Sequence, residues 1–435
     1  MAADKVYKTV LPNGLRVISE PMPDRDSVTL GVWVEVGSRY EPDAVAGVSH
    51  FLEHMVFKGT PTRSAKQIAL AIERLGGSLN AFTAREHTCF HVRVPGHDLP
   101  MAVDILADLS TRATLPGAEV VKERKVISEE IKDVHDTPHE HVHDLFAGQM
   151  WPGHPIGRPI AGTLATVGAT TRAALQSHRR AYYRPDRVVV AASGALQHKR
   201  LVDLVRRQFR FGAKSASRMA QSPPNGLPPI RRVTGRDINQ THVVIGVPTW
   251  AFADKRRYAL LVASSLLGGG MSSRLFQTVR EKRGLVYTIY AFHDAYQDTG
   301  FLAVYFACDP SQVVQATDLV LAEVGRLART QVGTVEMADV KSQLTGSLLL
   351  GLESTSSRMH RLARHELYLG DYISPKETMK SINRVSASDL TSLAREAFTT
   401  DRVALTILGP VTDTTIGEID WGRLSPGRAK KTPQQ

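Results

Sequence analysis

The chain repeats itself, and this repeat limits its possible folds more than any other feature. Residues 180–195 read RAYYRPDRVVVAASGA, and residues 395–410 read REAFTTDRVALTILGP. Each copy combines a helix-like segment that ends in an aromatic residue, a turn, and a β-branched run suited to a buried strand. The pattern predicts an internal duplication and therefore two homologous domains. Five residues of the first copy recur 215 positions later as identical residues: Arg180, Asp186, Arg187, Val188 and Gly194 match Arg395, Asp401, Arg402, Val403 and Gly409.

Strand-like and helix-like segments occur together in both copies. The segment VYKTVLPNGLRVISE indicates a β-hairpin that turns at Asn13-Gly14, and AKQIALAIERLGG indicates a helix stopped by Gly76-Gly77. These patterns predict an α+β fold made twice, as two α/β-sandwich domains. We expect an N-terminal domain over residues 1–211, a linker rich in Ser, Pro and Gly over 212–229, a homologous C-terminal domain over 230–420, and a basic, disordered tail over 421–435.

Composition argues against several classes of protein. The 435 residues are 42% hydrophobic and 22% charged, as in ordinary soluble proteins, and no apolar run approaches the roughly 20 residues of a membrane span. The net charge of +11 is spread over short mixed groups, which predicts a solvated surface and no nucleic-acid partner. The first residues lack a signal-peptide core and an Arg-rich leader, so we expect a cytoplasmic, bacterial protein with no membrane partner. We expect Cys89 and Cys308 to be buried free thiols.

A candidate metal motif lies in AGVSHFLEHMVFKGT, residues 46–60. On a helix, His50, Glu53 and His54 project from one face because they stand at positions i, i+3 and i+4. Two neutral imidazoles can reach one zinc ion at about 2.0 to 2.1 Å, and a carboxylate beside them can take a proton from a water molecule that the metal acidifies. The alternative is a structural pair of core histidines bonded to Glu53. The H-x-x-E-H spacing, the inverzincin signature, favours catalytic zinc.

A catalytic zinc site usually has three protein ligands, so a third must come from elsewhere in the chain. The predicted amphipathic helix over residues 119–135 offers several acids, and spacing alone does not choose among them. Glu123 and Glu130 lie two helical turns apart and share a face, which suggests a ligand with a supporting carboxylate. The acids of this helix are Glu119, Glu123, Glu129, Glu130 and Asp133.

The sequence resembles the inverzincin, or pitrilysin-like, metallopeptidases, in particular the half-length branch that includes the mitochondrial processing peptidase β-subunit. The segment GSRYEPDAVAGVSHFLEHMVFKGT carries the resemblance, which continues through LGGSLNAFTAREHT, EVVKERKVISEEI, HPIGRPIAGT and LLGGGMSSRLFQTVREKRGLVY. In that family a glutamate 76 residues after the second histidine completes the zinc site. The resemblance thus implies one Zn²⁺ per chain, held by His50, His54 and Glu130, with Glu53 as general base and Glu123 as the supporting acid.

The resemblance also implies functions for other segments. REKRGLVY matches the family's Arg and Tyr pair, which implies that Arg280 and Tyr287 stabilise the oxyanion. LNAFT resembles the edge strand to which peptide adds, with Asn80, Ala81 and Phe82 as contacts. Without the resemblance, Arg280 is a surface residue of a helix, Tyr287 a strand aromatic and LNAFT an ordinary strand.

The resemblance implies an endopeptidase that acts on short or unfolded peptides. A chain of this length would form half of a clamshell chamber, so we expect a homodimer. Two alternatives stay open: a processing-peptidase subunit that needs an inactive sister chain as a heterodimer, and a noncatalytic assembly subunit. The segment HDTPHEHVHDLF departs from the family pattern; we expect His135, His139, His141 and His143 to be surface residues, with a second metal site as the alternative.

Overall fold

The computed structural model describes residues 5–214, 222–224 and 230–424. Its contacts divide the chain into two compact units, each assembled from three separate segments. Unit 1 contains residues 1–135, 158–222 and 349–374, and unit 2 contains residues 136–157, 223–348 and 375–435. The division therefore differs from two consecutive domains, because a segment of each half of the sequence belongs to the other unit.

Unit 1 is built on a six-stranded mixed sheet with the strand order β1-β2-β6-β3-β5-β4. Only β2 and β6 pair in parallel, and β1 and β2 form the predicted hairpin, in which Gly14 has a φ of 90°. The strands are β1 (Tyr7–Val10), β2 (Arg16–Pro21), β3 (Ser27–Val34), β4 (Ser78–Thr83), β5 (Thr88–Pro95) and β6 (Val188–Gly194). The helices are α1 (Val48–Val56), α2 (Ala65–Glu73), α3 (Leu99–Arg112), α4 (Gly117–Asp136), α6 (Leu164–Ala169), α7 (Arg172–Tyr182), α8 (His198–Gln208) and α12 (Thr355–Leu369).

Unit 2 repeats this plan with a five-stranded sheet of order β7-β11-β8-β10-β9. The pair β7-β11 is parallel and the others are antiparallel, so this sheet matches the β2-β6-β3-β5-β4 part of the sheet in unit 1. The duplication seen in the sequence is therefore a duplication of the fold. The strands are β7 (Arg231–Gly235), β8 (Thr241–Thr249), β9 (Val286–Ala295), β10 (Gly300–Cys308) and β11 (Ala404–Gly409), and the helices are α5 (Pro138–Met150), α9 (Arg257–Gly268), α10 (Val313–Arg329), α11 (Thr334–Gly351), α13 (Pro375–Arg384), α14 (Ala387–Ala397) and α15 (Thr414–Glu418).

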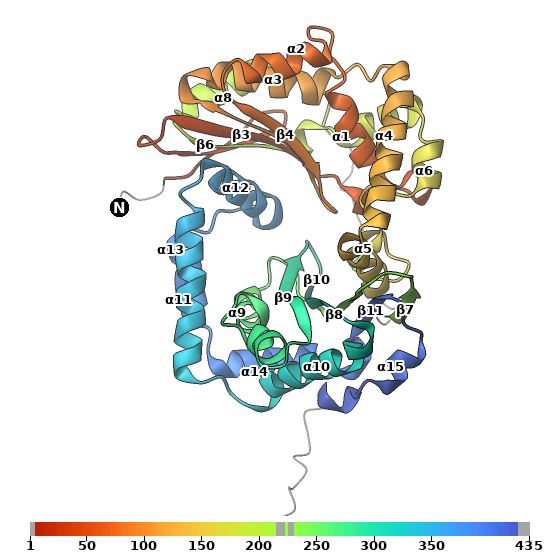
Figure 1. Ribbon diagram of the computed structural model, residues 1–435. Coiled ribbons are helices and arrows are strands. Elements are labelled where there is room, and N and C mark those ends of the chain that lie inside the picture. The colour runs from red at the N-terminus through yellow and green to blue at the C-terminus, as the bar shows by residue number, and fades with distance from the viewer. Residues whose placement is uncertain (1–4, 215–221, 225–229, 425–435) are drawn as a thin grey trace, which may run out of the picture. The chain divides into compact units, whose positions relative to one another are not determined.

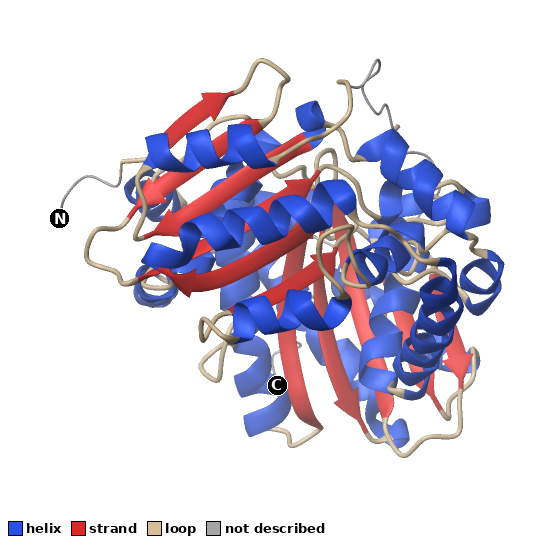
Figure 2. Cartoon of the chain, turned by 90° about the horizontal axis from the view of Figure 1, so that it is seen from above, coloured by secondary structure: helices blue, strands red, loops and turns tan. Residues whose placement is uncertain are grey.

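Both faces of each sheet are covered. In unit 1, α3 and α8 pack on one face of the sheet and α12 on the other, and Figure 2 shows helices lying over the strands. In unit 2, α9, α10 and α14 pack on one face and α5 on the other. Strands covered on both faces lose the alternation of apolar and polar residues, and all residues of β6 and of β11 are indeed buried.

Helix α5 belongs to unit 2 although it comes from the first half of the sequence, and α12 belongs to unit 1 although it comes from the second half. Each of these exchanged helices packs in a small hydrophobic cluster on the sheet of its unit. Met359 of α12 lies against Trp33 of β3, whose indole nitrogen is 3.3 Å from the methionine sulfur. Arg358 of the same helix pairs with the buried Glu20 of β2. In unit 2, Phe146 of α5 packs on the sheet. The expected boundaries 1–211 and 230–420 miss this exchange, because it depends on contacts between residues far apart in the chain.

The C-terminal boundary also differs from the expectation. Residues Trp421–Leu424 form a short 3₁₀-helix, so these residues are not part of a disordered tail. Leu424 is buried in the core of unit 2, and the Arg231 guanidinium lies over the Trp421 ring at 3.6 Å. The packed C-terminal part of unit 2 therefore extends to residue 424. The rest of the expected tail, and most of the expected linker 212–229, lie outside the described residues.

Two further expectations concern the cysteines and membrane-spanning helices. Cys89 and Cys308 are buried free thiols, as predicted. Over residues 5–214, 222–224 and 230–424, none of the helices has the combination of length and apolar character that crossing a membrane requires.

Candidate metal centre

Helix α1 carries the H-x-x-E-H motif and is fixed at its start by a buried acid. Gly47 precedes the helix with a φ of 92°, and a Cβ on it would lie 2.4 Å from the Ala161 carbonyl oxygen, so only glycine suits this position. The Glu41 carboxylate accepts hydrogen bonds from the backbone N–H groups of Gly47 and Ser49, both at 2.6 Å. A carboxylate at a helix N-terminus satisfies free N–H groups and complements the helix dipole. These two hydrogen bonds therefore fix the N-terminus of α1.

The structure brings His50, His54 and Glu130 together, although Glu130 lies on α4. Glu130 Oε2 is 3.9 Å from His50 Nε2 and 3.6 Å from His54 Nε2. The two imidazole rings are 4.7 Å apart between centroids. Among the described residues, this is the only group of three or more His, Cys, Asp or Glu whose ligand atoms all lie within 4.8 Å of one another.

This arrangement fits a zinc ion. Three ligand atoms bound tetrahedrally at the usual zinc distances would lie about 3.4 Å apart, close to the separations between Glu130 and the two histidines. Burial and, to a smaller extent, the neighbouring charge of His54 together lower the pKa of His50 to about 4. His50 is therefore neutral at pH 7 and keeps a lone pair for a metal.

Glu123 supports the group from the adjacent side. Its Oε2 lies 3.1 Å from His54 Nδ1, and its Oε1 forms an ion pair of 2.6 Å with the Lys58 ammonium. If His54 donates its Nδ1 proton to Glu123, its Nε2 carries the lone pair that faces Glu130. The sequence analysis did not identify Lys58, which lies two residues after the end of α1.

Glu53 points to a different partner from the two histidines. Its Oε2 accepts a hydrogen bond of 2.6 Å from the Thr83 hydroxyl at the end of β4. Burial raises the pKa of Glu53, although the Thr83 hydrogen bond and the charge of His54 oppose the rise. Glu53 is absent from the three-residue ligand group, which leaves its carboxylate available for proton transfer. The sequence did not point to Thr83 either.

The predicted peptide contacts Asn80, Ala81 and Phe82 lie on β4, at one edge of the sheet. In the described part of the chain β4 pairs only with β5, so its other edge has no strand beside it. Asn80 is exposed, whereas the Phe82 ring packs against Trp33, with ring centroids 5.5 Å apart. An edge strand of this kind can accept an added strand through its main-chain groups.

Arg280 and Tyr287 lie together in unit 2. Arg280 belongs to a short π-helical segment, Phe276–Glu281, and its guanidinium lies over the rings of Phe276 at 4.5 Å and Tyr287 at 5.3 Å. Tyr287, the second residue of β9, exposes 76% of its surface. The pair thus combines a cation with an exposed phenol ring beneath it.

The histidine-rich segment divides into exposed and packed residues. His139 is exposed, but His143 faces the sheet of unit 2, where its Nε2 lies 3.2 Å from the Tyr290 hydroxyl. The expectation of four surface histidines is therefore wrong for His143, because α5 packs on the sheet. In residues 5–214, 222–224 and 230–424 these histidines form no group with the spacing of a metal site.

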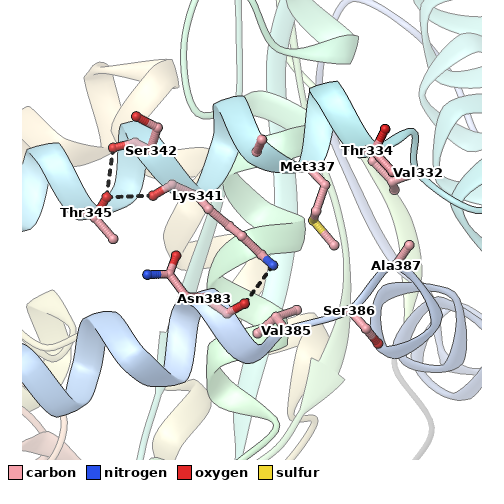
Figure 3. A pocket seen from close by; sticks show the side chains of 11 residues that line it. Val332, Thr334, Met337, Lys341, Ser342, Thr345, Asn383, Val385, Ser386 and Ala387 are labelled. Atoms are coloured by element: carbon pink, nitrogen blue, oxygen red, sulfur yellow. Dashed lines mark hydrogen bonds between the residues drawn. The ribbon is translucent and has the colours of Figure 1, made fainter.

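Figure 3 shows a pocket of about 480 Å³ in unit 2, between α11 and the segment that joins α13 to α14. Met337 and Val385 line it with apolar surface, and the Lys341 ammonium donates a hydrogen bond of 2.9 Å to the Asn383 carbonyl oxygen. No His, Cys, Asp or Glu lines this pocket. It therefore offers no second place for a metal ion.

The chain is similar to known proteins over most of its length. Residues 16–164 match the insulinase family, peptidase family M16, and residues 169–344 match the peptidase M16 inactive domain. An uncharacterized zinc protease of Mycobacterium tuberculosis is 43% identical over 408 residues, which cover 93% of each chain. A crystal structure of a protease from Helicobacter pylori is 23% identical, with a TM-score of 0.86 over 94% of this chain and 100% of that chain. A chain of complex III2 from Candida albicans is 20% identical, with a TM-score of 0.82 over 96% of this chain and 98% of that chain.

Proposed function

The chain belongs to peptidase family M16, the insulinase family, and from this premise we propose that it is a zinc-dependent endopeptidase that cleaves short or unfolded peptides. The observation that carries the proposal is the grouping of His50, His54 and Glu130 beside the Glu53 carboxylate, which is not one of the three ligands. Three ligands with an adjacent acid are what a hydrolytic zinc site needs. We propose one zinc ion per chain.

In the proposed mechanism, the chain's own residues bind the peptide and move one proton. When bound, zinc supplies Lewis acidity, which acidifies water and polarises a peptide carbonyl. The main chain of β4 at Asn80, Ala81 and Phe82 binds the peptide as an added strand. Glu53 takes a proton from the water that attacks the carbonyl carbon, and it returns this proton to the amide nitrogen as the C–N bond breaks. Glu123 holds His54 in the tautomer whose Nε2 is free.

Arg280 and Tyr287 have an electrostatic role in this proposal. We assign them as hydrogen-bond donors to the oxyanion that forms when water adds to the carbonyl carbon. Support comes from their side-by-side placement, the exposure of the Tyr287 ring and the resemblance of REKRGLVY to the family's Arg and Tyr pair.

The proposal is tested with purified wild-type protein and Glu53→Gln. Wild type should retain zinc after dialysis and cleave a flexible peptide. Glu53→Gln should retain the same zinc content, because the ligands remain, while turnover falls by about 10²-fold or more. A folded wild type that retains no zinc, or a Glu53→Gln variant that cleaves at the wild-type rate, would contradict the proposal.

Strand addition also limits the shape of the substrate. A peptide must be extended to pair with β4, so a stably folded, disulfide-locked protein should be cleaved much more slowly than a flexible peptide. Equal rates for the two substrates would argue against β4 as the docking strand.

We further propose that the active unit is a homodimer, in which two chains together enclose the peptide. Light scattering of the isolated chain beside its specific activity separates the alternatives. An active monomer at dilute concentration would contradict the dimer. A chain that becomes active only with a second protein would favour a heterodimer, and a chain that retains zinc without cleaving any peptide would favour a noncatalytic assembly subunit.

A further inference from the structure

The last residue of β4, Thr83, contacts the residue proposed as general base. Its Oγ1 donates a hydrogen bond of 2.6 Å to Glu53 Oε2. Of residues 5–214, 222–224 and 230–424, Thr83 alone donates a hydrogen bond to this carboxylate. The second oxygen, Glu53 Oε1, accepts no hydrogen bond from the described residues and is not fully buried. One oxygen is therefore held by the protein, and the other is open to a water molecule.

Both sides of this contact are fixed by their elements. The pairing of Thr83 with Thr88 of β5 sets the position of the Thr83 backbone. Glu53 stands on α1, whose start is fixed by the Glu41 carboxylate. Asn80 and Phe82, proposed to bind peptide, lie on the same short strand as Thr83. A single hydrogen bond thus joins the strand proposed to bind the substrate to the carboxylate proposed to move the proton.

We propose that Thr83 is a positioning residue that fixes the Glu53 carboxylate so that Oε1 meets the attacking water. The inference rests on the proposed function. Glu53 receives the proton on Oε1 and returns it to the leaving nitrogen, while the Thr83 proton stays on Oγ1 throughout. A carboxylate without this contact samples more side-chain conformations, and a loss of position of about 1 Å can lower a rate by up to about 10²-fold.

The first test compares Thr83→Val, which removes the hydroxyl at nearly constant volume, with Thr83→Ser, which keeps the hydroxyl. We expect Thr83→Val to lower kcat about tenfold, with KM within about twofold and zinc content unchanged, because the hydroxyl acts on proton transfer and not on docking. Thr83→Ser should recover most of kcat.

The matched control is Thr88→Val, the same substitution on the paired residue of the neighbouring strand. The Thr88 hydroxyl donates to the Val36 carbonyl oxygen at 2.9 Å and has no contact with Glu53. Thr88→Val should therefore leave kcat unchanged. Wild-type kcat in Thr83→Val, equal losses in Thr83→Val and Thr83→Ser, or a raised KM at unchanged kcat would overturn the inference.

A second test needs neither zinc nor activity. A double-mutant cycle of unfolding free energies in the metal-free protein compares Thr83→Val in wild type and in Glu53→Ala. The cost of Thr83→Val should be smaller in the Glu53→Ala background, and additive costs would overturn the inference even in an active enzyme. If zinc-loaded wild type cleaves no peptide, the proposed function fails and the catalytic role of Thr83 fails with it. An active wild type matched by Thr83→Val overturns the Thr83 inference alone.

Discussion

Replacing Glu123 by glutamine should weaken zinc binding without removing a proposed ligand. The Glu123 side chain is 8% exposed and has two partners, His54 Nδ1 at 3.1 Å and the Lys58 ammonium at 2.6 Å. Glutamine keeps one oxygen that can accept a hydrogen bond from His54 Nδ1–H, but it presents an amide NH₂ group to Lys58. The variant therefore leaves the Lys58 charge without its counter-ion beside the metal centre.

The size of the effect follows from these contacts. Loss of a carboxylate that orients a metal-bound histidine typically lowers metal affinity by about 10- to 100-fold. This range corresponds to about 1.4 to 2.8 kcal/mol. Glu123→Gln should fall near the lower end because it can keep the contact with His54. Glu123→Ala removes both contacts and should fall near the upper end.

The assay is a titration of metal-free protein with zinc in competition with a chromophoric chelator. Glu129→Gln is the matched control, since Glu129 lies on the same helix and its carboxylate pairs at the surface with Lys132. Glu129→Gln should bind zinc as tightly as wild type. Unchanged affinity in Glu123→Ala, or an equal loss in Glu129→Gln, would refute the assignment of Glu123 as the supporting acid.

Three further predictions address other parts of the molecule. Tyr287→Phe should lower kcat by about 10²- to 10³-fold if its hydroxyl binds the oxyanion, and a wild-type kcat would leave Tyr287 with a structural role only. Burial lowers the pKa of His178 to about 4, whereas the unfolded chain binds that proton near 6.5, so His178 alone should lower the stability by about 2 kcal/mol as the pH drops to 5. Denaturant unfolding at pH 7 and pH 5 measures this loss, and His178→Gln should reduce it. Arg358→Met removes one partner of the buried Glu20 pair and should cost about 3 to 5 kcal/mol in the same unfolding assay; a loss under about 1 kcal/mol would mean that α12 does not depend on that pair.

Local sequence patterns determined much of the fold. The duplicated segments become α7 with β6 and α14 with β11, and the aromatic residues Tyr183 and Phe398 cap the two helices as the repeat indicated. The i, i+3, i+4 spacing of His50, Glu53 and His54 likewise predicts a shared helix face, because helical geometry depends only on near neighbours. The duplication predicted two α/β domains and the resemblance predicted the family, and both predictions are confirmed.

Segments far apart in the sequence meet only in the tertiary structure. Spacing left five acids of α4 open as the third ligand. The position of α4 beside α1 brings Glu130 to the two histidines and Glu123 to His54, 69 residues away. The contact of Thr83 with Glu53 spans 30 residues, and the exchange of α5 and α12 between the units spans many more. A sequence pattern carries information about the next helical turn or the alternate strand residue, whereas these contacts depend on which buried surfaces pack together once the whole chain has folded.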